Sequence, residues 1–188
     1  MKTINEISKI KAVVLYILHN LEGGADFIKL FKIMYFAQQE NLVMYGKPIF
    51  NDTFHALKHG PVPSFTYKCT QVLDGRIEPK QDIDQFICSF QVTESKFYGK
   101  EEPDMEELSK SDIRVLNSAI GKYKNVDSYA LSDRSHQDNA YIEAYNRAQN
   151  DPEKDRMSLL EIARSGNATS EMLEYIRNKE QLKKELMF

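Results

Sequence analysis

Two histidines four positions apart are the first residues whose spacing could do chemistry. On a helix, His55 and His59 would present both imidazoles to one metal ion, and His136 or Asp52 could complete the ligand set. Pro48 before them and a Gly-Pro pair directly after them argue against a helix. In a strand the two rings would stand about 13 Å apart, at roughly 3.3 Å per residue. A metal-assisted hydrolase is therefore an alternative, beside a structural one in which His59 and His136 hydrogen-bond backbone carbonyls and fix loops.

Other catalytic signatures are missing from the sequence. Its eight glycines form neither G-x-x-x-x-G-K nor G-x-G-x-x-G, and there is no G-x-S-x-G elbow. Cys69 and Cys88 lie too far apart for a C-x-x-C pair, and no neighbouring residue type activates Cys69 to react with His136. We expect both thiols, Cys69 in a helix and Cys88 in a strand, to be small buried groups in a reducing compartment. The sequence implies no cofactor.

Charge and hydropathy exclude several classes of partner. The chain has 25 Lys and Arg against 28 Asp and Glu, a net charge of −3, which disfavours broad binding to DNA or anionic lipid. A helix-turn-helix over 126–149 is disfavoured because Asp127, Asp133, Asp138 and Glu143 offset its arginines. No apolar run is long enough to span a membrane, and no secretion signal is recognised. We expect a cytoplasmic protein that binds neither membrane nor nucleic acid through this chain.

Helical periodicity dominates the first part of the chain. Residues 4–21 carry one apolar stripe at spacings of three and four, which predicts a helix. A second helix begins near Phe27, and its wider apolar face indicates that it is the central one. Glycine and proline then break the pattern, so a short extended piece is expected within 49–58. A third helix is predicted between Pro63 and Gly75.

The second part of the chain mixes strands and helices. Alternation over 86–92 predicts a half-buried strand, and 96–98 a second short one. With the piece at 53–58 they are expected to form one small antiparallel sheet packed on helices. Ser109 and Asp112 resemble a capping box that starts a helix. Further helices are expected at about 126–132, 135–149, 156–164 and 169–186. The fold class is thus mostly α: a single helical domain with a small antiparallel β-sheet.

Three groups of residues carry a resemblance to a known family. They are K-L-F-K-I-M-Y-F-A at 29–37, Y-G-K-P-I-F-N-D-T-F-H-A with H-G-P-V-P between 45 and 63, and L-S-D-R-S-H-Q-D at 131–138. In order and spacing they resemble the Panacea domain, the SocA-like or phage-associated GepA-like antitoxin family. Its pattern is a K-L-L-Y-F-A helix, a G-x-P-I-x-x-D-x-F-x-A turn and strand, a G-P-V turn and a later L-S-x-x-T-H.

The resemblance covers about residues 5–150 of a domain expected to span 1–188, and the helices of 151–188 lie outside its motifs. The sequence departs from the family pattern in three conservative ways. Ile33-Met34 replaces two leucines, Ser135 replaces a threonine, and Tyr141 stands where tryptophan is usual.

The resemblance implies an antitoxin that neutralises a toxin encoded beside it by direct binding, without catalysis. The cognate toxin is then the expected partner, and Tyr35, Asp52, His59 and His136 are candidates to line the surface that binds it. Asp52 is also suited to cap a backbone amide in the turn. The motif residues expected to maintain the fold are Gly46, Pro48, Gly60, Pro61, Leu131 and Ser132.

Two further questions stay open at this level. A phage or mobile-element accessory protein that binds a host protein, with no toxin involved, is an alternative function. The last helix, 169–186, has an apolar face that could dock on its own domain, enter a groove of a partner, or form the seam of a homodimer.

Overall fold

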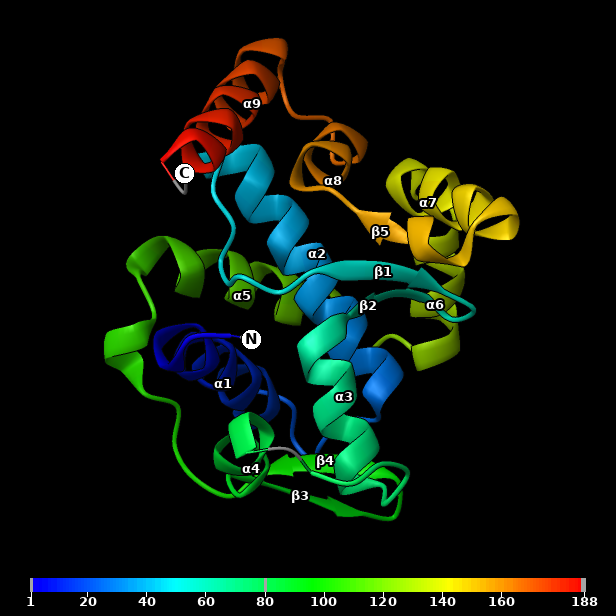
Figure 1. Ribbon diagram of the computed structural model, residues 1–188. Helices are drawn as coiled ribbons and strands as arrows, with labels where there is room; N and C mark the ends of the chain where they lie inside the picture. Colours follow the sequence, from blue (N-terminus) through cyan, green and yellow to red (C-terminus); the bar gives the residue numbers. More distant parts are fainter. Residues whose placement is uncertain (1, 80, 187–188) are drawn as a thin grey trace.

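The computed structural model describes residues 2–79 and 81–186, and within these ranges the chain is mostly helical, as predicted (Figure 1). Its α-helices are α1 (Ile4–His19), α2 (Phe27–Tyr45), α3 (Ser64–Leu73), α4 (Gln81–Ile87), α5 (Lys110–Tyr123), α6 (Ser128–His136), α7 (Asn139–Asn150), α8 (Leu159–Ser165) and α9 (Ser170–Glu185). The strands are β1 (Phe54–Leu57), β2 (Gly60–Pro63), β3 (Phe90–Thr93), β4 (Lys96–Gly99) and β5 (Arg156–Met157), with short 3-10 turns at Met105–Glu107 and Pro152–Lys154.

Helix α2 is the central element, as its wide apolar face indicates. It packs against α1, α5, α6, α8 and β2. Asp26 caps its first turn by accepting a hydrogen bond from the amide of Lys29, and Gly46, with φ of +60°, ends it. A glycine suits that end because the left-handed conformation carries no side-chain penalty there. Residues 30–38 of α2 are all buried, so the polar residues among them must find partners inside the protein.

Two capping boxes fix where helices begin. Thr3 and Glu6 form one at α1, and Ser109 and Asp112 form the predicted one at α5. In each box, the hydroxyl of the Thr or Ser accepts a hydrogen bond from the backbone amide of the acidic residue. The carboxylate of that acidic residue accepts one from the backbone amide of the Thr or Ser. Each N-cap contributes about 1 kcal/mol to the stability of its helix.

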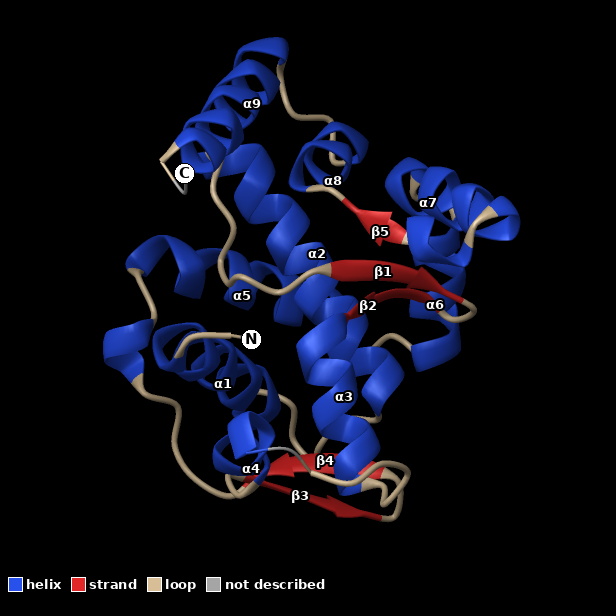
Figure 2. Cartoon of the chain, viewed as in Figure 1, coloured by secondary structure: helices blue, strands red, loops and turns tan. Residues whose placement is uncertain are grey.

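The prediction of one sheet is wrong, because the strands form two separate sheets (Figure 2). β1 pairs antiparallel with β2, and on its other edge with β5. β3 and β4 form an independent hairpin. Its turn residues, Glu94 and Ser95, both have positive φ, 52° and 62°, which is the geometry of a tight hairpin turn.

The strand predicted over 86–92 begins later than expected. Phe86 belongs to α4, and only Phe90 onward is strand. Both rings are buried, with centroids 4.7 Å apart. Two residues four positions apart lie on the same side of a strand, but they can also lie together where a helix ends and a strand begins, so the sequence pattern did not distinguish the two. Cys88 lies in the turn between them and is exposed, which corrects its expected burial; Cys69 is buried in α3 as expected.

The two ends of the molecule differ (Figure 1). Helix α9 lies at one end, over the C-terminus of α2, where Met172 and Tyr175 approach Gly46 so closely that a Cβ there would stand 2.7 and 2.5 Å from them. The β3–β4 hairpin lies at the opposite end, beside the start of α2. The buried apolar residues of the described ranges form one cluster that runs from Ile7 to Ile176.

Candidate functional site

The three family-like segments meet at the turn between β1 and β2. Three carbonyl oxygens of this turn region accept hydrogen bonds from side chains of three helices. Tyr141 of α7 donates to Leu57, Ser132 of α6 donates to His59, and Lys32 of α2 donates to Pro61, each over 3.0 Å. We call Lys32, Ser132, Ser135, His136 and Tyr141 the turn clamp, because together they hold this hairpin against the helices.

Lys32 and Ser135 of the turn clamp approach the hairpin closely at Gly60. Its φ is +93°, a backbone conformation that favours glycine. A Cβ at this position would overlap the hydroxyl oxygen of Ser135 and stand 2.8 Å from Cε of Lys32. The glycine therefore lets α2 and α6 approach the hairpin directly, which gives the expected structural role of Gly60 a physical cause.

Lys32 is a buried cation without a counter-ion among the described residues. Its side chain is only 1% exposed, and its ammonium donates to the Pro61 carbonyl. Burial lowers the pKa of Lys32 from 10.5 to about 7, since the charged form loses its hydration. The lysine is accordingly close to half neutral at physiological pH while it still donates a hydrogen bond.

Asp52 serves α3 rather than the surface. Its carboxylate accepts from the amides of Phe65 and Thr66 at 3.0 and 3.2 Å, and from the hydroxyl of Ser64 at 3.1 Å. Because Pro63 occupies the N-cap position without a side-chain hydrogen bond, Asp52 supplies the cap from outside the helix. The expected capping role is confirmed. The buried carboxylate, however, does not lie on a partner-binding surface as predicted.

Tyr35 is likewise internal. It is 0% exposed, and its ring packs edge-to-face on Phe54 and Phe36. Burial, and then the neighbouring Asp138 carboxylate, raise the pKa of the Tyr35 phenol well above its usual value. The expectation that Tyr35 lines a surface is corrected, because residues 30–38 of α2 are all buried.

The two histidines remain at the surface. His59 is exposed at the tip of the hairpin, and His136 is half-buried at the end of α6, where it stacks on Tyr141 with centroids 4.8 Å apart. Burial, followed by the nearby charge of Lys32, lowers the pKa of His136, and a backbone hydrogen bond at Lys58 acts in the opposite direction. This bond matches the structural alternative for His136, which is to hold a loop.

The remaining motif residues have structural positions. Leu131 is fully buried, and Gly46 and Gly60 have positive φ. Ser132 bonds the hairpin rather than capping its own helix, whose cap is Asp127.

The histidines that suggested a metal do not converge. The imidazole of His55 pairs with Asp155 across β1 and β5, with Nδ1 and Oδ1 2.7 Å apart. Within residues 2–79 and 81–186, no three His, Cys, Asp or Glu side chains are grouped so that they could hold a metal ion. The hydrolase alternative thus gains no ligand set from these residues.

Comparison with known proteins gives one match. The family described as Antitoxin SocA-like, Panacea domain, matches residues 30–141, more than half of the chain, and this stretch contains every residue of the turn clamp. No curated protein and no solved structure matches. No described helix combines the length and the apolar character that crossing a membrane would require. With this match and the clamp that its motifs build, the chain belongs to the Antitoxin SocA-like, Panacea domain family.

Proposed function

We propose that this protein is an antitoxin that neutralises a cognate toxin in the cytoplasm by binding it directly, without catalysis. The family match carries the proposal, because it spans all three motif segments in order. The geometry supports it in one respect. The polar motif residues Tyr141, Ser132 and Lys32 hold the hairpin in place by donating to the carbonyls of Leu57, His59 and Pro61, and they do not form a cluster of reactive groups.

Growth rescue tests this function. The reading frame adjacent to the gene is expressed alone and together with this chain, and colonies are counted. The proposal expects killing by the neighbour alone and restored growth with both. Gly60→Val serves as the negative control, because its side chain would collide with Ser135 and Lys32, and a protein with a displaced hairpin should not restore growth. A harmless neighbour, or killing that persists with wild-type protein at full expression, contradicts the proposal.

Direct binding is tested separately by co-purification of the two proteins. Rescue without a stable complex would indicate that neutralisation works by another route. His59 and His136 stay candidates for the contact, since both reach the surface beside the hairpin. His59→Ala should then weaken the complex while leaving the melting temperature unchanged, because the side chain is exposed. Unchanged binding would remove His59 from the interface.

A protein that binds a host factor without any toxin is the second candidate, and the exposed apolar side chains of α9 favour it. Tyr175, Leu182 and Leu186 are 50%, 54% and 77% exposed and follow one face of the helix. A pull-down from cells that lack the adjacent gene distinguishes the two. A specific partner lost on truncation of α9 would favour this candidate.

A further inference from the structure

The end of the molecule opposite α9 carries two adjoining cavities of opposite character. The first has a volume of about 550 Å³ and is formed by the start of α2, the β3–β4 hairpin and the start of α6. Phe27, Ile28 and Val92 supply its apolar lining, and Tyr129 stands at its edge with 66% of its surface exposed. We call this the acidic cavity, because three aspartates also line it. The volume falls within the ordinary range of binding pockets, roughly 300–1,000 Å³.

The aspartates of the acidic cavity are held in place by the fold. Asp26 accepts from the amide of Lys29 at 3.0 Å and from the hydroxyl of Ser128. Asp127 caps α6 by accepting the amide of Tyr129 at 2.9 Å. Asp74 pairs with Arg76 at 2.6 Å. No lysine or arginine is among the residues that line this cavity, but Arg76 beside it neutralises Asp74, so its fixed negative charge comes from Asp26 and Asp127.

The apolar lining is also rigid. The ring of Phe27 packs edge-to-face on Phe97, with centroids 5.6 Å apart, and stacks on Phe31 at 6.3 Å. Phe27, Ile28 and Val92 are only half-buried, so part of each side chain still contacts water. Because the Phe27 ring is already held by these contacts, it does not have to be ordered when a partner binds, which lowers the entropic cost of binding.

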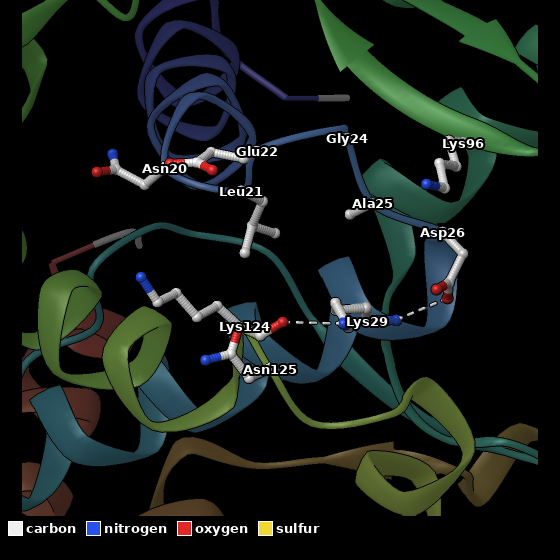
Figure 3. Close-up of a pocket in the computed structure, with 10 residues that line it drawn as sticks. All are labelled: Asn20, Leu21, Glu22, Gly24, Ala25, Asp26, Lys29, Lys96, Lys124 and Asn125. Carbon is white, nitrogen blue, oxygen red and sulfur yellow. Dashed lines mark hydrogen bonds between the residues drawn. The ribbon is translucent and has the colours of Figure 1, made fainter.

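The second cavity, of about 340 Å³, shares Asp26 with the first and is lined by lysines (Figure 3). Lys29 lies next to Lys124 and donates to its carbonyl at 3.1 Å, while Lys96 stands on the opposite side. Within the described part of the chain, none of these three ammonium groups pairs with a carboxylate. We call this the lysine cavity. Glu22 and Asp26 also line this cavity, so its charge is only weakly positive, and it borders the acidic cavity at Asp26.

We propose that the cognate toxin docks at this end. In this arrangement a toxin segment places a lysine or arginine beside a large apolar side chain in the acidic cavity, and a toxin carboxylate reaches the lysine cavity. This inference rests on the proposed function and adds the surface and the chemistry of the partner. Charge complementarity selects a protein of that pattern, because neighbouring cavities of unlike charge match a partner that carries both signs, whereas a nucleic acid or an anionic membrane presents negative charge alone. Tyr129 is suited to be an anchor, since exposed tyrosines often dominate interfaces.

The test compares three variants of the full chain with matched controls. Asp74→Asn/Asp127→Asn removes two charges while asparagine keeps an oxygen to cap α6. Tyr129→Ala removes the anchor, and Lys96→Gln/Lys124→Gln neutralises the lysine cavity. Tyr175→Ala, an aromatic residue of similar exposure on α9, and Asp133→Asn/Glu143→Gln, two exposed acids outside both cavities, are the controls. The purified product of the adjacent reading frame is the probe, and affinity is measured calorimetrically at low and high salt.

We expect each cavity variant to lose about tenfold in affinity or more, equivalent to roughly 1.4 kcal/mol. For the two charge variants the loss should shrink at high salt, whereas for Tyr129→Ala it should persist. The controls should bind as wild type does.

If wild type does not bind the probe at all, the proposed function fails together with this surface. If wild type binds and all cavity variants bind equally well, only the surface is wrong. Self-association of wild type that Tyr129→Ala abolishes, with toxin affinity unchanged, would assign the surface to a second copy and overturn the proposal.

Discussion

The ammonium of Lys32 in the central helix donates to the carbonyl of Pro61 across 3.0 Å, in the middle of the molecule. A lysine in such a place is costly, because the buried charge loses its hydration and no carboxylate of the described residues compensates it. A backbone carbonyl of the hairpin would otherwise be unpaired in the core. The bond therefore ties the position of the β1–β2 turn to α2, and it makes stability depend on pH.

Stability should rise with pH between about 7 and 9.5. The folded lysine releases its proton near pH 7, whereas the unfolded one keeps it up to about 10.5, so the unfolded state binds more protons in this window. A gain of about 3 kcal/mol in the free energy of unfolding is expected by pH 9.5. Urea unfolding at each pH measures it. The window ends there because of buried Tyr35, whose pKa is raised in the folded protein. Above about pH 10 the unfolded tyrosine loses its proton while the folded one keeps it, so stability falls again.

Lys32→Met is the matched variant for this pH dependence. It should flatten the slope over the same window, because the titrating group is gone. Its stability at pH 7 combines two opposing changes, a removed desolvation cost and an unpaired Pro61 carbonyl, so the slope is the diagnostic quantity. A slope as steep as that of wild type would assign the effect to another group.

Gly60→Ala should be far more destabilising than Gly23→Ala. Both glycines have strongly positive φ, +93° and +85°, but an added Cβ meets nothing within 4 Å at Gly23 and collides with Ser135 and Lys32 at Gly60. We expect a loss of about 1 kcal/mol at Gly23 from backbone strain alone, and about 3 kcal/mol or more at Gly60. Chemical denaturation of both variants measures the difference. Equal losses would show that the clamp is looser than described.

Removing two hydroxyl groups of the clamp should loosen the hairpin without unfolding the protein. Ser132→Ala and Tyr141→Phe each remove one hydrogen bond to a carbonyl of the turn, which costs about 1 kcal/mol apiece. Amide hydrogen exchange should accelerate in residues 57–60 and stay slow in α5. Tyr145→Phe, on the same helix and stacked on Tyr141, is the control and should leave the turn unchanged.

Asp52→Ala should destabilise α3. It removes the acceptor of the Phe65 and Thr66 amides, and a loss of about 2 kcal/mol is expected. Asp104→Ala removes a cap from an exposed 3-10 turn and should cost no more than about 0.5 kcal/mol. Thermal unfolding of both compares them. A small effect at Asp52 would return that residue to the candidates for partner contact.

Sequence patterns located most of the helices, because caps and periodicity are local properties. Asp112 marked the start of α5 correctly, and the wide stripe of α2 indicated its central place. The predicted strands at 86–92 and 96–98 placed the β3–β4 turn correctly, but nothing in the sequence indicated the positive φ of Glu94 and Ser95, because neither is the usual glycine or asparagine. The pairing of β1 with β5 joins residues a hundred positions apart, which no local pattern reports.

The candidate site was predicted only in part. The motif residues were found, but Tyr35 and Asp52 were assigned to a surface although both are buried. Lys32 was not singled out, although it lies within the wide apolar face of the second predicted helix, where a lysine that cannot reach water needs a hydrogen-bond acceptor inside the protein. The acidic and lysine cavities depend on how four distant segments meet, which only the fold reveals.

The short strand β5 also has a consequence for association between chains. It covers the outer edge of β1, pairing Phe54 with Met157, and just before it the carbonyl of Asp155 accepts the amide of Ala56 at 2.8 Å. Asp155 and Met157 lie beyond the segment that the family match covers. An uncovered β1 would offer free amide and carbonyl groups to a strand of another molecule. The segment around β5 thus protects the edge of β1 from pairing with a strand of another molecule. A chain truncated before Asp155 would expose that edge and should aggregate more readily.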